Sequence, residues 1–93
     1  MIIIWSEQAK ISYEKIIDNL IEKWNTDIAF NFENLTNETL DKLKTNKKLC
    51  PSSKQSQLRK CVIHKNASLI YKISKQDIEL VTFIFNKSDH SFY

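Results

Sequence analysis

Residues 2–9 read Ile-Ile-Ile-Trp-Ser-Glu-Gln-Ala, an apolar run that ends at a serine. The first four residues are β-branched or aromatic, which is the composition of a buried strand. Ser6 stands where a helix N-cap belongs, and Glu7 would face the positive end of the helix dipole. The chain is therefore predicted to begin with a strand over residues 2–5 that passes directly into a helix.

Two helices are predicted after this junction. Apolar residues recur at the 3.6-residue spacing through residues 7–24, and charged side chains fill the other side. Asn25 and Thr26 indicate a stop followed by a new N-cap, and similar spacing predicts a second helix to about Thr45. The pair would form a helical hairpin.

Three strand-like runs follow a polar, Pro-interrupted loop at residues 46–57. These runs span residues 58–64, 69–73 and 78–85, and the breaks between them are short enough for hairpins. The prediction is one α+β domain over residues 1–93. Its order is β-α-α-β-β-β: an N-terminal strand, a helical hairpin and a three-stranded antiparallel meander.

Both faces of the predicted meander contain apolar residues. Strict alternation would put Ile78, Leu80, Thr82 and Ile84 on one face of the last strand and Glu79, Val81, Phe83 and Phe85 on the other. A helical hairpin covers only one face. Either a partner peptide or the C-terminal tail would cover the other.

Charge is distributed unevenly along the chain. Residues 42–75 hold ten cations (nine Lys and Arg59) and no Asp or Glu, whereas residues 1–41 hold three Lys and eight acids. The formal net charge of +3 therefore conceals a strong separation of charge. A fold that gathers the cations would present a basic zone to a phosphate backbone or an acidic protein. The alternative is an ordinary solvated face.

Composition excludes several classes of protein. A 93-residue chain that is 42% hydrophobic is no disordered tail, and no apolar run approaches the roughly 20 residues that span a bilayer. The N-terminus has neither the basic leader nor the cleavage site of a signal peptide, so we expect a cytoplasmic protein that uses no membrane. Glycine is absent, which rules out a Gly-rich phosphate loop.

The chain holds two cysteines and two tryptophans. Cys50 and Cys61 could form one bridge, but we expect free thiols, because the cytosol is reducing and the core is adequate. The Cys and His spacings do not match a zinc site, and we expect neither a metal nor a cofactor. Trp5 and Trp24 bracket the first helix and are expected to pack in the core.

The predicted order of elements and two local segments resemble the RelE/ParE superfamily, the small toxins of type II toxin–antitoxin modules. The segments are Trp5-Ser6-Glu7-Gln8-Ala9 at the strand-to-helix junction and Leu58-Arg59-Lys60 entering the meander. Tyr71 in the middle strand and Asn86-Lys87-Ser88-Asp89 after the last strand also fit, so that the resemblance covers nearly the entire chain. It implies a growth inhibitor that forms a hetero-oligomer with a cognate antitoxin.

The superfamily contains two chemistries. RelE-like members cut messenger RNA in the ribosome, using basic side chains and often a C-terminal Tyr or His. ParE-like members inhibit DNA gyrase with no known bond-breaking step of their own. RelE-like toxins carry an Arg at the position of Ser68, and Cys61 stands where another Lys would help. We therefore expect a ParE-like gyrase inhibitor. The alternatives are a ribosome-dependent mRNA endoribonuclease and a non-toxic nucleic-acid-binding module.

Candidate site residues follow from charge and from the resemblance. The candidates for catalysis, if the chain is a nuclease, are Arg59, Lys87, His90 and Tyr93. The residues expected to contact the target or partner are Arg59, Lys60, Lys65, Lys72 and Lys87, which strand alternation could gather near one edge of the meander. Lys87-Ser88-Asp89 resembles the Arg-x-Asp of ParE-like chains, although Lys lacks the planar fork of Arg.

Overall fold

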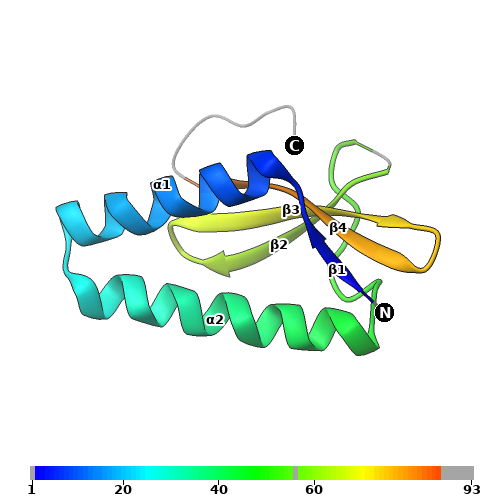
Figure 1. Cartoon of the computed structure of the whole chain (residues 1–93), viewed down its shortest axis with the longest axis horizontal. Coiled ribbons are helices and arrows are strands. Elements are labelled where there is room, and N and C mark those ends of the chain that lie inside the picture. Colours follow the sequence, from blue (N-terminus) through cyan, green and yellow to red (C-terminus); the bar gives the residue numbers. More distant parts are fainter. Residues whose placement is uncertain (1, 56, 87–93) are drawn as a thin grey trace.

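The computed structural model describes residues 2–55 and 57–86. Its elements are β1 (Ile3–Trp5), α1 (Glu7–Lys23), α2 (Thr26–Thr45), β2 (Arg59–His64), β3 (Ala67–Ser74) and β4 (Asp77–Phe85) (Figure 1). The predicted α+β class and the β-α-α-β-β-β order are confirmed. The predicted site residues Lys87, His90 and Tyr93 lie outside the described residues.

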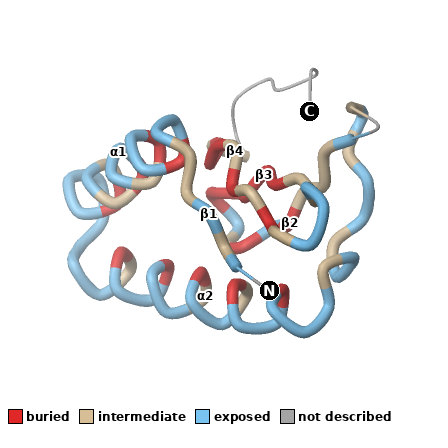
Figure 2. The backbone as a smooth tube through the Cα atoms, turned by 45° about the vertical axis from the view of Figure 1, so that its right-hand side comes forward, coloured by how far each residue is buried: buried red, intermediate tan, exposed pale blue. Residues whose placement is uncertain are grey.

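The four strands form one sheet in the order β1-β4-β3-β2. The meander is antiparallel as predicted, and β1 adds to it in parallel with β4, with Ile3 opposite Ile78 and Trp5 opposite Leu80. Both helices pack on the same face of the sheet, where the buried residues of all the layers meet (Figure 2). No helix of the described residues is long and apolar enough to cross a membrane.

Side-chain caps fix where the two helices begin. The Ser6 hydroxyl accepts a 3.0 Å hydrogen bond from the backbone N–H of Ala9, as the sequence predicted. The cap of α2 is Asn25, whose Oδ1 accepts a 2.9 Å bond from the N–H of Ile28, so Thr26 is the first helical residue instead of the cap. A single residue, Asn25, therefore ends the turn between the helices and starts α2.

An aromatic cluster fills the core between the helices and the sheet. The ring of Tyr13 lies 5.6 Å from that of Phe32 and 5.1 Å from that of Phe83, and Trp5 stacks on Phe83 at 5.6 Å. The prediction of a core role for Trp24 is wrong, because this side chain is 55% exposed. It is the C-cap of α1, one residue past the end of the helix.

A bulge interrupts the pairing of β3 with β4. Ile70 is opposite Thr82 but Tyr71 is opposite Leu80, which leaves Val81 as an extra residue on β4. One extra residue reverses the alternation of side chains along a strand. The described residues therefore place Leu80 toward the helices before the bulge and Phe83 toward them after it. Strict alternation along β4 was a wrong prediction beyond Val81.

Two serines hold the bulged segment: Ser6, the N-cap of α1, and Ser12 within the helix. Ser6 donates from its backbone N–H to the carbonyl of Leu80 at 3.1 Å and from its hydroxyl to the carbonyl of Val81 at 2.9 Å. The Ser12 hydroxyl accepts a 2.9 Å bond from the N–H of Phe83 and donates to the carbonyl of Gln8 at 2.7 Å. The backbone groups that the bulge removes from the ladder thus find partners on the helix.

The sheet face turned away from the helices is uneven. Ser68 and Ile70 are fully buried on this face, whereas Val62 and Ile4 are 69% and 45% exposed. The tail proposed as a cover for this face lies outside the described residues. Cover by a tail or by a partner peptide therefore stays a prediction.

Replacing Ser12 tests the bond between helix and bulge. We expect Ser12→Ala to lower the free energy of unfolding by about 1–3 kcal/mol, because the buried N–H of Phe83 loses its partner. Denaturant unfolding measures this loss. The matched control is Ser74→Ala at an exposed position, which should change stability by less than about 0.5 kcal/mol. Equal effects of the two substitutions would contradict this account.

Candidate interaction surface

Most of the ten cations in residues 42–75 belong to helix, strand and loop segments that meet at one end of the molecule. This end is where α2 finishes, β2 begins, β3 finishes and β4 begins, together with the connection over residues 46–58 (Figure 1). We call it the basic end. Its cations are Lys42, Lys44, Lys47, Lys48, Lys54, Arg59, Lys60, Lys72 and Lys75. The helices' connecting turn lies at the opposite end.

Ion pairing at the basic end is slight among the described residues. Lys44 lies 3.7 Å from Asp41 on α2, and Lys72 lies 3.4 Å from Glu79 across the β3–β4 pair. All four side chains are substantially exposed, so each pair contributes little. The remaining cations of this end have no ion-pair partner within the described residues.

The structure does not bring the predicted binding residues to one place. Arg59 is opposite Tyr71 on the helix side of the sheet, whereas the neighbouring Lys60 points to the other face, which Lys72 shares. Lys65 lies in the β2–β3 turn, far from the basic end, with its Nζ 5.8 Å from the centre of the Trp24 ring. Four of the predicted binding residues are described. Arg59, Lys60 and Lys72 lie at the basic end, on two faces of the sheet, and Lys65 lies elsewhere.

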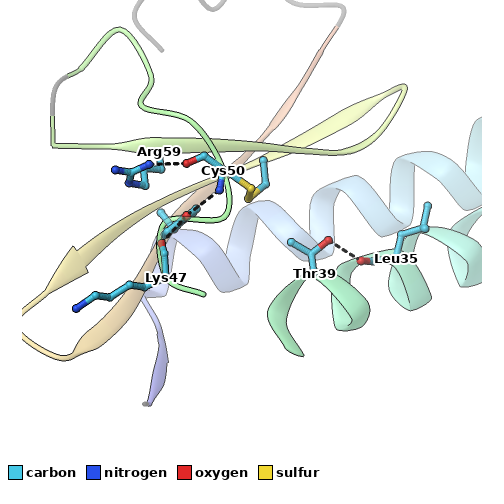
Figure 3. Close-up of a disulfide and its surroundings, with 7 residues drawn as sticks. Leu35, Thr39, Lys47, Cys50 and Arg59 are labelled. Carbon is cyan, nitrogen blue, oxygen red and sulfur yellow. Dashed lines mark hydrogen bonds between the residues drawn. A yellow bond between two sulfur atoms is a disulfide. The ribbon is translucent and has the colours of Figure 1, made fainter. Parts of the chain in front are cut away.

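Arg59 is engaged with the connection that precedes β2. Its Nη1 donates a 2.7 Å hydrogen bond to the carbonyl of Cys50 (Figure 3). Beside it, the buried Tyr71 hydroxyl donates to the carbonyl of Lys47 at 2.8 Å and accepts a 3.4 Å bond from the N–H of Cys50. Burial raises the pKa of Tyr71, although the Cys50 N–H and the charge of Arg59 act in the opposite direction.

Cys50 and Cys61 form a disulfide, with their Cα atoms 5.3 Å apart. The prediction of free thiols was wrong, since it used the redox state of the compartment and contained no information on distance. The connection returns to the sheet at the start of β2, and strand alternation turns Cys61 toward the same side as Arg59. Alternation places Cys61 only, whereas the position of Cys50 depends on how the connection folds back, which no local pattern in the sequence encodes.

Ser68, where the resemblance to RelE-like toxins led us to look for an Arg, is fully buried. Its hydroxyl donates a 2.6 Å bond to Oδ1 of Asn86, whose Nδ2 donates to the carbonyls of His64 and Lys65 at 2.9 and 3.2 Å. These bonds tie the end of β4 to the β2–β3 turn. Sequence reasoning missed this structural role of Asn86.

His64 is held as the neutral imidazole. Its Nδ1 accepts a 3.2 Å bond from the N–H of Asn66, and its ring meets Phe32 edge-on at 6.5 Å. Loss of solvent lowers the pKa of His64 below its usual value, and the nearby charge of Lys65 acts in the same direction. The described residues contain no group of three or more His, Cys, Asp or Glu side chains that could hold a metal ion.

An open groove of about 610 Å³ lies between β1 and the C-terminal half of α2. It is lined by Ile2, Ile3, Trp5, Asn37, Leu40, Asp41 and Lys44. Because β1 is an edge of the sheet that residues 2–55 and 57–86 form, this groove adjoins strand backbone that no other described strand covers. The groove reaches the basic end at Lys44.

Comparison with known proteins finds a protein family and solved structures that match this chain. A family model described as the ParE toxin of the type II toxin–antitoxin system parDE matches residues 3–90. The chain therefore belongs to the ParE toxin family. It is a type II toxin of the RelE/ParE superfamily, as the resemblance predicted.

Solved structures share the fold at low sequence identity. The chromosomal ParDE system from P. aeruginosa matches with a TM-score of 0.76 and 14% identity, over 91% of this chain and 95% of that chain. A YoeB dimer from Staphylococcus aureus gives 0.62 and 17%, over 88% and 92% of the two chains. A YoeB/ParE toxin from Agrobacterium tumefaciens gives 0.64 and 11%, over 92% and 99%. No curated protein sequence matches the chain.

The state of His64 gives a pH dependence that can be measured. The lowered pKa means that the unfolded state binds the proton first, so we expect stability to be complete above about pH 6.5 and to fall as the pH drops below that value. His64→Asn keeps an acceptor for Asn66 but does not titrate there. Denaturant unfolding at several pH values between neutral and mildly acidic gives the free energy of unfolding as a function of pH. This free energy should fall less steeply with pH in the variant than in the wild type. Equal slopes would show that the pKa of His64 is not lowered by folding.

Proposed function

We propose that this toxin inhibits growth in the cytoplasm by acting on DNA gyrase, without cutting a nucleic acid itself. The observation that carries the proposal is Ser68, a neutral and fully buried residue where the nuclease branch places a cation. Cleavage by attack of the 2′-hydroxyl requires positive groups around the scissile phosphate. A buried hydroxyl bonded to Asn86 supplies no such charge.

The surroundings of Arg59 support the same choice. Its guanidinium is bonded to the Cys50 carbonyl, and Cys61, two residues further along β2, is part of a disulfide. Among the described residues, the strand positions that would surround a phosphate thus contribute one cation. A ParE-like toxin needs a binding surface instead, which the basic end offers.

We further propose that the cognate antitoxin covers the basic end and the groove beside β1. Residues 41–60 and 72–79 together hold nine cations and three acids, a net charge of +6. An acidic segment would be attracted to this end, and an extended apolar segment fits the groove against the free edge of β1. The complex would be a hetero-oligomer of toxin and antitoxin.

Inducible expression separates the possible targets. We expect growth arrest that the neighbouring antitoxin gene relieves, together with accumulation of relaxed or broken DNA, because gyrase would be blocked. Purified gyrase should lose supercoiling activity when the toxin is added, and toxin premixed with antitoxin is the control. Codon-periodic cuts in messenger RNA would show an endoribonuclease instead. Harmless expression combined with steeply salt-dependent binding to DNA or RNA would show a simple binding module.

Charge reversal tests the docking of the antitoxin. We expect the double variant Lys48→Glu, Lys54→Glu to slow association with the antitoxin about tenfold or more at low salt, because both side chains are exposed at the basic end. The matched control is Lys10→Glu, Lys15→Glu on α1, which changes net charge equally. Surface plasmon resonance at two salt concentrations measures the rate at which each double variant associates with the antitoxin. Equal slowing by the two double variants would contradict docking at the basic end.

A further inference from the structure

The connection between α2 and β2 is fastened to the sheet at Cys50. The residue makes three separate contacts: the disulfide to Cys61, the N–H bond to the Tyr71 hydroxyl and the carbonyl bond from Arg59 (Figure 3). Tyr71 also holds the carbonyl of Lys47. The covalent link therefore lies in the middle of the contacts that keep Arg59 against the connection.

We propose that the Cys50–Cys61 disulfide is a redox latch on Arg59. In the disulfide form, the latch holds the connection on β2 and keeps the guanidinium of Arg59 bonded to the Cys50 carbonyl. Reduction releases the connection and frees Arg59 at the basic end. The consequence for growth inhibition rests on the proposed function, whereas the release of Arg59 does not.

The chemical step is thiol–disulfide exchange with a dithiol reductant. One thiolate of the reductant attacks Sγ of Cys50, the bond between the two cysteine sulfurs breaks, and the Cys61 sulfur leaves as a thiolate that takes up a proton. The second thiol of the reductant then displaces Cys50 from the mixed disulfide. Two electrons and two protons pass from the reductant, which becomes a disulfide, to the two cysteines.

The two cysteines differ in a way that suits a latch. Cys50 is half-buried and lies in the connection, whereas Cys61 is 3% exposed and lies within β2. Reduction leaves Cys61 as a small apolar group in the core, where a free cysteine packs well. The sheet therefore keeps its structure, and the change is confined to the connection.

The contacts that remain after reduction are weak enough to open. Around Cys50 they are two hydrogen bonds, a long one of 3.4 Å from its N–H to the Tyr71 hydroxyl and one of 2.7 Å from Arg59 to its carbonyl, and the net contribution of such bonds is modest. Among the described residues, the connection meets β2 through one isolated bridge, Ser52 to Arg59, which consists of the backbone bonds from Ser53 to Leu58 and from Lys60 to Pro51. Two further backbone bonds, from Leu49 to Asn46 and from Leu58 to Gln55, lie within the connection. Local opening of such a segment is expected without unfolding of the sheet.

Arg59 provides a direct readout, because it is the only arginine in the chain. An arginine-selective dicarbonyl reagent modifies that one side chain, and mass spectrometry counts it. We expect modification to be about tenfold or more faster after reduction, since the guanidinium leaves its bond to Cys50. The variant Cys50→Ser, which keeps the buried Cys61, should react at the fast rate with and without a dithiol. Equal rates for the oxidised and reduced protein would overturn the latch.

Tryptic cleavage locates the opening. Cleavage after Lys47, Lys48 and Lys54 should accelerate on reduction, while cleavage after Lys10 and Lys15 in α1 should not change. If cleavage accelerates equally at all five sites, the disulfide stabilises the whole fold instead of the connection alone, and the latch is wrong. A separate thermal-unfolding measurement on Cys50→Ser shows whether the variant is folded under the conditions of the cleavage experiment.

Growth inhibition tests the consequence of the latch. We expect the wild-type toxin to be weaker by about fivefold to a hundredfold in a host that lacks thiol-reducing enzymes than in a normal host, and Cys50→Ser to be equal in both. Equal inhibition by the two proteins in both hosts would overturn control by the latch. If neither protein inhibits growth while Arg59 still responds to reduction, the latch stands and the proposed function fails.

Discussion

The contact between α1 and the bulge of β4 determines how the layers of this toxin fit together. Val81 is an extra residue on β4, and it turns the second half of that strand over, so that Phe83 joins the same core as Leu80. A bulge leaves backbone groups without partners in the ladder. Ser6 and Ser12 supply those partners from the helix, which sets both the start of α1 and its position against the sheet. The aromatic cluster of Trp5, Tyr13 and Phe83 depends on that position.

The same arrangement separates the two charged parts of the chain. The helical hairpin carries most of the acids, and the ends of α2, β2 and β3 bring the cations together with the connection over residues 46–58. Charge in a small toxin serves recognition more than stability, because exposed pairs contribute little. The disulfide adds a covalent constraint where the cations meet, which makes the geometry of that end sensitive to redox conditions.

The sequence contained most of the fold but only part of the site. Periodicity and the cap at Ser6 were sufficient for every element, because these signals depend on neighbouring residues. The bulge at Val81 could not be predicted, since nothing in the alternation of β4 distinguishes an extra residue from a regular one. The disulfide and the Arg59–Cys50 bond depend on how a loop returns to the sheet, which no local pattern encodes. Trp24 was misplaced because composition reports that a side chain is apolar without showing whether the helix has already ended.

The parallel pairing of β1 with β4 also determines when the molecule can become complete. Ile3 is opposite Ile78, so β1 acquires its neighbour only after the segment that holds β4 has been made. Contacts between such distant segments form late in folding. The β3–β4 hairpin, whose strands are neighbours in the chain, is therefore expected to form first, and the edge strand β1 then joins a sheet that already exists.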